Sequence, residues 1–185
     1  MRPPAVLGAL VLGAVIGGMA VEYWLTRATP RPGAQTSAAP AGDVAADVAH
    51  LKSIQLTQST TMMEVGYHWA SLWFAAGNKN WPLARYLFDE ARQGVRWTIL
   101  IKPVRDLPGG GTVNIKGLFA AIDPSAFAAV QIAIEDEDHA QFVATYKQTL
   151  EACHSCHVAI GKPFLRPVIP TVPPSTLISF EPAPK

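Results

Sequence analysis

The last long helical pattern of the chain ends in Cys153-His154-Ser155-Cys156-His157. Over residues 139–160, the apolar and site residues recur every three or four positions, which is the spacing of one helix face. Gly161 and Pro163 come next, and both residue types are typical of the end of a helix. We therefore expect a helix over 139–160 that carries two thiols and an imidazole close to its carboxyl end.

Two cysteines separated by two residues and followed directly by histidine form the pattern of c-type haem attachment. The thiols of Cys153 and Cys156 would each bind one vinyl group of the porphyrin, and His157 would be the proximal ligand of the iron. A zinc site is the first alternative, but it needs two further ligands, and the other histidines show no paired spacing. A thioredoxin-like dithiol is the second, but no strand pattern precedes this helix. The motif predicts one covalently bound haem c.

Three further helical patterns precede this helix. Apolar residues recur at helical spacing over 48–76 and over 82–101, where Gly94 indicates close approach to a neighbouring helix. The third pattern, 123–134, opens with an Asp-Pro pair, which is typical of an N-cap and a first helical residue; the alternative is a helix extended upstream over residues 118–122. The connections are short except for the glycine-containing loop 104–115, for which we expect no strand. These patterns predict an all-α fold, an antiparallel four-helix bundle.

The first 28 residues contain a hydrophobic segment. Residues 5–25 reach the length of about 20 helical residues that spans a bilayer core, and Tyr23 and Trp24 are typical of a membrane interface. A cleaved signal peptide is the alternative, because Gly18-Met19-Ala20 has the small residues of a cleavage site. Either kind of segment directs the rest of the chain across a membrane. We expect a transmembrane helix in the inner membrane and a periplasmic domain.

The remaining chain divides by composition into three parts. Residues 29–42 are rich in Pro and Ala and predict a linker, and residues 43–162 contain the helical patterns and predict the haem domain. Residues 163–185 contain repeated prolines, which exclude a helix and predict an extended strap that lies on the bundle or reaches a partner. The whole chain has 15 Lys+Arg against 14 Asp+Glu, so it lacks the basic excess of a nucleic-acid-binding protein.

The sequence resembles the cytochrome c′ and cytochrome c-556 group. The resemblance covers residues 43–164 and rests on Tyr146 and the Cys153–His157 motif of the last helix, together with the helix-turn-helix pattern 69–81. It implies a four-helix haem domain in which a residue of the first helix faces the distal side of the iron. Methionine there implies a six-coordinate haem that transfers electrons, and an aliphatic residue implies a five-coordinate haem that binds gases. Tyr146 is expected to pack on the haem ring.

Helical geometry ranks the candidates for the sixth ligand. At about 100° per residue, Met62 lies about 45° from the centre of the 48–76 stripe, His68 about 75° and Met63 about 145°. Met62 also lies nearer the level expected for the end of the last helix. We expect Met62 to bind the iron opposite His157, and His68, Met63 or an open distal site are the alternatives. A core methionine without a ligand role is the structural alternative for Met62.

These features predict a membrane-anchored periplasmic monohaem cytochrome that carries single electrons and is not an enzyme. Its partner would be a redox protein or a membrane redox complex, and the resemblance also implies a homodimer. The alternative function is binding of nitric oxide or carbon monoxide at an open distal site; a small peroxidase is less favoured, because no distal His-Arg pair is evident. His154 is expected to face solvent. Lys162 and Arg166 would pair with haem propionates, steer an acidic partner or be solvated.

Overall fold

The computed structural model describes residues 41–184, so the predicted anchor 1–28 and nearly all of the predicted linker lie outside the described residues. The chain is mostly helical and belongs to the all-α class. It divides into two units, Met1–Ser53 and Ile54–Lys185, and we call the second the helical unit. In the first unit, helix α2 (Ala41–Ser53) exposes its side chains from Val44 onward. The predicted start of the haem domain at residue 43 thus falls within α2, ahead of the helical unit.

The predicted single helix over 48–76 is wrong, because it is two helices, α2 and α3 (Gln58–Gly77). Thr57 caps α3, since its hydroxyl accepts a hydrogen bond of 3.2 Å from the amide of the third residue after it. Leu51 lies in α2 and Ile54 in the connection between the two helices, and both are exposed. Because residues 48–76 do not form one helix, the angles that ranked the sixth-ligand candidates on that stripe have no valid reference.

Helix α4 (Trp81–Ile101) returns beside α3, as the sequence predicts. Asn80 caps it by accepting a hydrogen bond of 3.3 Å from the amide of Leu83. A Cβ atom at Gly94 would lie 2.8 Å from Cγ2 of Val65, which is closer than the two helices allow. The prediction that Gly94 permits a close approach is therefore confirmed.

The loop predicted over 104–115 contains a small hairpin, so the expectation of no strands is wrong here. Strands β1 (Val104–Asp106) and β2 (Thr112–Asn114) pair antiparallel. Gly110 and Gly111 form its tip with φ angles of 92° and 81°, which residues with a side chain rarely adopt. Each strand has three residues, too few to reveal an alternating pattern in the sequence.

The third helical segment starts at Ile115, three residues before the upstream extension predicted from residue 118 and well before the Asp-Pro start. It consists of α5 (Ile115–Ile122), the π-helical turn η1 (Asp123–Phe127) and α6 (Ala128–Glu135). The side chain of Asn114 caps α5 by accepting a hydrogen bond of 2.9 Å from the amide of Gly117. The Asp-Pro pair therefore lies inside the helix, where the wider turn accommodates a proline that has no amide hydrogen to donate.

The run Ile115–Glu135 is, among the described helices, long and apolar enough to cross a membrane by length and composition alone. Its buried residues Phe127, Val130 and Ile134 belong to the core of the helical unit, and α6 packs against α4 and α7. Core helices have the same composition, so the property does not indicate a second membrane segment.

Asp123, inside this segment, pairs with two arginines of α4. Its carboxylate accepts hydrogen bonds of 2.5 Å from Arg92 and 3.1 Å from Arg96. Burial alone would raise the pKa of Asp123, but the hydrogen bonds and charges of the two arginines lower it below its ordinary value. The ion pair therefore stabilises the fold when the carboxylate is charged.

We expect Asp123→Asn to lower the free energy of unfolding by about 1 kcal/mol at pH 7, because the pair is partly exposed to solvent. Since the folded pKa is lowered, this contribution is present above the unfolded pKa of about 3.9 and disappears as the pH falls through the folded pKa. Urea unfolding of both proteins at a series of pH values measures the difference. A difference that stays constant down to about pH 2 would contradict the assignment.

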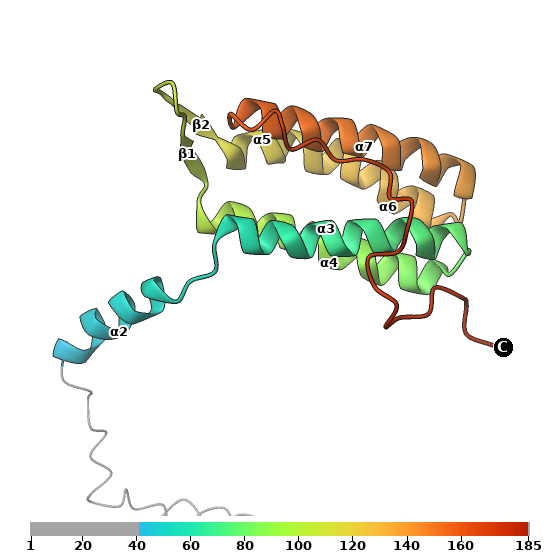
Figure 1. Ribbon diagram of the computed structural model, residues 1–185, viewed down its shortest axis with the longest axis horizontal. Helices are drawn as coiled ribbons and strands as arrows, with labels where there is room; N and C mark the ends of the chain where they lie inside the picture. Colours follow the sequence, from blue (N-terminus) through green and yellow to red (C-terminus); the bar gives the residue numbers. More distant parts are fainter. Residues whose placement is uncertain (1–40, 185) are drawn as a thin grey trace, which may run out of the picture. The chain divides into compact units, whose positions relative to one another are not determined.

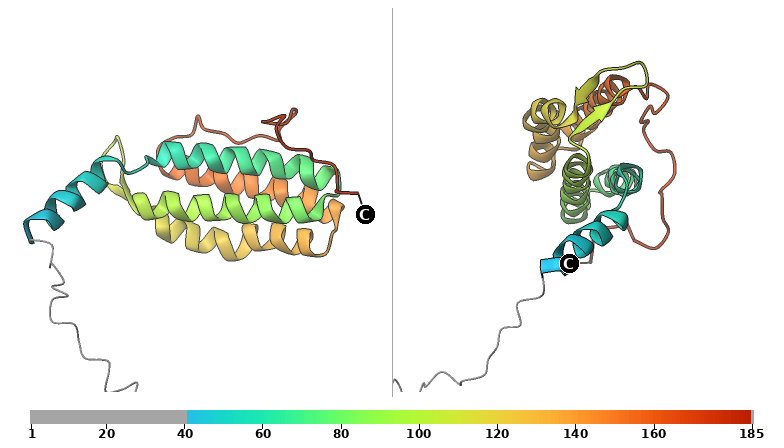
Figure 2. Two further views of the ribbon diagram at one scale, coloured as in Figure 1. Left: turned by 90° about the horizontal axis from the view of Figure 1, so that it is seen from below. Right: turned by 90° about the vertical axis from the view of Figure 1, so that its left-hand side faces the viewer.

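Helix α7 (His139–Ala159) confirms the predicted last helix. Asp138 caps it through a hydrogen bond of 2.9 Å from the amide of Gln141, and Gly161 lies just after it with a φ of 75°. Helices α3 and α4, the α5–α6 segment and α7 lie side by side (Figures 1 and 2). The core between them is aromatic and aliphatic; its largest fully buried side chains include Leu72, Leu87, Phe88, Phe127, Phe142 and Tyr146.

Residues 162–184, which we call the strap, contain no helix or strand, as the prolines predict. The strap runs back along the helices toward the end of α3 (Figure 1). Near its own end, Phe180 is buried against Phe74 at 5.8 Å between ring centroids. The side-chain amide of Asn80 donates a hydrogen bond of 2.9 Å to the carbonyl oxygen of Glu181. The strap therefore lies on the helical unit, the first of the two predicted arrangements.

Candidate functional site

Cys153, Cys156 and His157 lie in the last turns of α7, and all three are half-buried. The two cysteines form no disulfide. Burial raises the pKa of the Cys153 thiol to about 12 and also raises the pKa of Cys156. Both thiols are therefore protonated at neutral pH. A redox-active dithiol needs a lowered thiol pKa, so these raised values oppose the thioredoxin-like alternative.

The imidazole of His157 is oriented by the strap. Its Nδ1 lies 2.6 Å from the carbonyl oxygen of Leu165. A carbonyl oxygen only accepts hydrogen bonds, so Nδ1 carries the hydrogen and donates it. In the neutral ring the lone pair is then on Nε2, the atom available to a metal. Such a hydrogen bond on the far nitrogen is the usual support of a metal-binding histidine.

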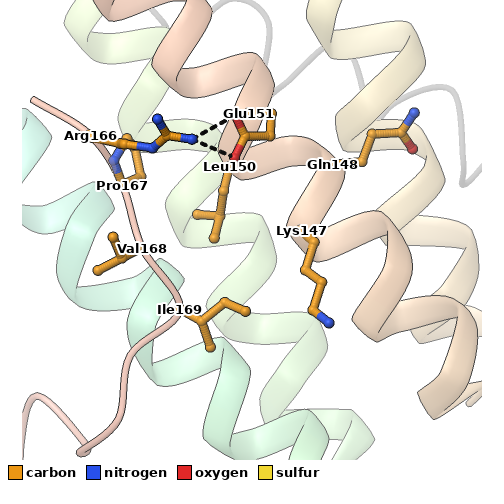
Figure 3. A pocket seen from close by; sticks show the side chains of 8 residues that line it. All are labelled: Lys147, Gln148, Leu150, Glu151, Arg166, Pro167, Val168 and Ile169. Carbon is orange, nitrogen blue, oxygen red and sulfur yellow. Dashed lines mark hydrogen bonds and ion pairs between the residues drawn. The ribbon is translucent and has the colours of Figure 1, made fainter. Parts of the chain in front are cut away.

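Three further contacts fix the start of the strap against α7. The Nε2 atom of His154 donates to the carbonyl oxygen of Pro163 at 3.1 Å, and this bond is exposed, so His154 lies at the surface as expected but also contacts the strap. The amide of Lys162 donates to the carbonyl oxygen of His157 at 2.8 Å. Arg166 binds the carboxylate of Glu151 at 3.3 and 3.4 Å, and the prediction of a propionate partner for Arg166 stays open (Figure 3).

Beyond this pair, α7 and the strap line a hollow of about 470 Å³ (Figure 3). Leu150 of α7 and residues 166–169 of the strap form its walls, together with Lys147, Gln148 and Glu151 of α7. Leu150 lies on the same helix face as Tyr146 and Cys153, since these positions are three or four residues apart. The strap thus covers one side of the face that carries the cysteines.

Two turns before Cys153, Tyr146 is buried against α3. Its ring stacks on Trp69 at 5.1 Å and lies 5.0 Å from Trp73, and its hydroxyl donates a hydrogen bond of 3.0 Å to the carbonyl oxygen of Trp69. Burial raises the pKa of the Tyr146 hydroxyl above its ordinary value. Tyr146 is therefore a core residue that connects α7 to α3. Its expected packing on a haem ring stays a prediction.

This contact sets the register between α7 and α3. The two helices run in opposite directions (Figure 1), and each rises about 1.5 Å per residue. Seven residues after Tyr146 comes Cys153, and seven residues before its partner Trp69 comes Met62. Met62 therefore lies level with the cysteine motif.

Helical direction separates Met62 from its alternatives. At about 100° per residue, Met62 lies about 20° from Trp69, which contacts α7, whereas His68 lies about 100° and Met63 about 120° away. Met62 is half-buried, and Met63 is 67% exposed. His68 has a buried Nδ1 without a hydrogen-bond partner and lies 5.3 Å from the ring of Tyr67. Of the three candidates, Met62 alone combines the level and the direction of the cysteine motif.

The donor set fits a porphyrin better than a bare metal ion. Within residues 41–184, no group of three or more His, Cys, Asp or Glu side chains converges to hold a metal, although Cys153, Cys156 and His157 share one helix end. Cys153 and Cys156 lie about one turn apart and His157 lies about one turn after Cys153, a spacing that would suit a wide planar group instead. The buried Nε1 of Trp69, on the side of α3 that contacts α7, has no hydrogen-bond partner, so a donor is available there to a polar group of a ligand.

Comparison with known proteins finds no matching family model, no similar curated protein and no similar solved structure. The residues that sequence reasoning missed act through the backbone: the carbonyl groups of Pro163 and Leu165, which bind His154 and His157. A carbonyl group is present at every position, so no residue type indicates it. The prolines that keep the strap extended were the only available signal.

Proposed function

We propose that the chain is a monohaem c-type cytochrome of the cytochrome c′ and c-556 kind, built on an antiparallel four-helix bundle of α3, α4, the α5–α6 segment and α7. The observation that carries this proposal is the hydrogen bond from His157 Nδ1 to Leu165, because it leaves Nε2 free beside two cysteines of the attachment pattern. The N-terminal hydrophobic segment would hold the protein to the inner membrane from the periplasmic side.

The residues of the site have separate roles in this proposal. Cys153 and Cys156 would hold the haem through thioether bonds, and His157 would bind its iron. The bound haem would supply an iron that gains and loses one electron. Leu165 keeps the His157 ring in one orientation and one tautomer, and its hydrogen bond makes Nε2 a stronger donor. The buried stack of Tyr146 on Trp69 excludes water from the inner end of the site.

Met62 decides between the two functions that this fold can support. Its level and direction place its thioether side chain on the side of α3 that faces α7. We therefore propose ligation by Met62 and His157, which closes the iron to small gases and favours electron transfer. Binding of nitric oxide or carbon monoxide at an open distal site is the function expected if Met62 remains a core residue.

Optical absorption of the full-length protein, expressed with a c-type haem maturation system, tests the proposal. We expect haem that stays on the chain after denaturation, together with a sharp low-spin spectrum of the reduced protein that carbon monoxide does not change. A chain that stays colourless would contradict the cytochrome assignment. A high-spin spectrum that shifts with carbon monoxide would support the assignment as a haem protein but favour gas binding over electron transfer.

A further inference from the structure

A second hollow, of about 460 Å³, lies at the end of the helical unit that carries the cysteine motif. Hairpin residues 105–108, residues 160–162 and Phe164 line it. The hairpin packs on the end of α7, since a Cβ atom at Gly161 would lie 3.4 Å from Cδ of Pro108. The hollow is close to the site, because the amide of Lys162 donates a hydrogen bond to the carbonyl oxygen of His157. We call residues 102–108, Lys116 and residues 160–164 the docking face.

The docking face carries more positive than negative charge: Lys102, Arg105, Lys116 and Lys162 outnumber its single carboxylate, Asp106. Arg105 donates a hydrogen bond of 2.9 Å to the uncharged side chain of Gln58, and the amide of Lys116 binds the carbonyl of residue 103, which places it beside the hairpin. In the part of the chain that the structure describes, Arg105, Lys116 and Lys162 form no ion pair. Only Lys102 pairs with a carboxylate of this face, at 3.7 Å.

The opposite end of the helical unit is acidic. Residues 135–138, at the end of α6 and in the turn before α7, are four consecutive carboxylates, of which Glu135 pairs with Arg85. This acidic segment lies at the other end of α7, a helix of 21 residues, and so about 30 Å from the docking face. The near-zero net charge of the chain thus conceals a separation of charge along the helices. Such a separation orients a charged partner toward one end during encounter.

The centre of the docking face is apolar and concave. Phe164 is 77% exposed at its edge, and Leu107, Pro108 and Ile160 line the hollow. An apolar centre with a charged rim is the usual composition of a transient protein interface. A hollow accommodates a protruding side chain of a partner, whereas a bilayer surface is met by protruding residues. The hollow therefore favours a protein as the occupant, and binding of lipid through the exposed Phe164 is the outcome that would contradict it.

We propose that the docking face binds an acidic protein that exchanges one electron with this chain. The inference rests on the proposed function, because the electron would pass through the haem bound by His157, one turn from the face. The basic rim attracts the acidic partner to this end of the helical unit, and the hollow beside Phe164 supplies the apolar contact.

Stopped-flow reduction of the haem-loaded, full-length protein by a plant-type ferredoxin, an acidic one-electron protein, tests the proposal. Reduced ferredoxin loses one electron, and the ferric iron gains it. We expect the rate to fall as ionic strength rises, and the double variant Arg105→Glu, Lys162→Glu to be slower by about tenfold or more at low ionic strength. The control is the double variant Lys79→Glu, Lys147→Glu, at two lysines outside the docking face that, like Arg105 and Lys162, form no ion pair in the described part of the chain. It makes the same change of total charge and is expected to leave the rate within about twofold.

Equal losses in both double variants, or a rate that does not depend on salt, would overturn the proposal. Hydrogen exchange of the hairpin amides gives a readout that does not need haem: ferredoxin is expected to slow it. Slowing by phosphatidylglycerol nanodiscs, without any effect of ferredoxin, would assign the face to lipid and overturn the proposal. A chain without covalent haem would instead contradict the proposed function, and the exchange measurement would still test the face.

Discussion

Replacing Cys153 and Cys156 together by serine is expected to abolish covalent haem attachment. The serine hydroxyls form no thioether bonds, so nothing would keep the haem on the chain after denaturation. The serines match the size of the cysteines and leave α7 helical, which separates loss of attachment from loss of folding. Haem staining of the denatured protein, together with circular dichroism of the native protein, measures both. We expect no stain and an unchanged helical signal.

Ser155→Ala is the matched control, because Ser155 lies in the same motif between the two cysteines and points its hydroxyl to the backbone of its own helix. We expect it to bind haem like the unchanged chain. His157→Ala is expected to yield far less haem protein, because it removes the imidazole that would bind the iron and that Leu165 orients. A double serine variant that still stains for haem would show that Cys153 and Cys156 are not the attachment points.

The last helix was predictable because its signals agree. The apolar spacing and the stop at Gly161 and Pro163 indicate the same element, and the structure confirms it within one residue of its predicted end. The extended strap could be predicted from its prolines, since proline excludes a helix wherever it is repeated. The attachment pattern is local, so it could be found without the fold, whereas haem binding itself stays a prediction.

The errors arose where local signals compete. The break before α3 depends on one threonine cap, and Leu51 and Ile54 continue the apolar spacing across it although both are exposed. In the third segment, the Asp-Pro pair has the residues of a helix start, but Asn114 caps the helix earlier and two arginines occupy the carboxylate of Asp123. Two local caps decided where these helices start, and tertiary partners bind the carboxylate of Asp123. Apolar spacing contains no information about either.

The prediction of Met62 as the ligand used an apolar stripe over 48–76, from whose centre Met62 lies about 45° away. The structure divides that stripe between two helices, so it is no longer a valid reference. The contact of Tyr146 with Trp69 supplies a new reference, and Met62 lies closer to it than to the old one. Because this contact joins α3 to α7, it gives both the side of α3 that faces α7 and the position along α3 that lies level with the cysteines. This makes Met62 the residue whose substitution distinguishes the two functions.

Met62→Leu is expected to convert the reduced protein from a low-spin to a high-spin spectrum and to make it bind carbon monoxide. Leucine has nearly the volume of methionine but has no sulfur atom to bind the iron, so packing is kept while ligation is lost. The reduction potential is expected to fall, because a methionine ligand raises it. Titration with carbon monoxide and a spectroelectrochemical measurement check both results on one preparation.

Met63→Leu is the matched control, since Met63 is the neighbouring residue and is 67% exposed. We expect it to leave the spectrum and the potential unchanged. If His68→Ala produces the carbon monoxide response and Met62→Leu does not, the ligand is His68, and α3 must be rotated from the direction that the Trp69 contact defines. If the unchanged protein already binds carbon monoxide, no side chain of α3 closes the iron, and Met62 is a core residue of a gas-binding protein.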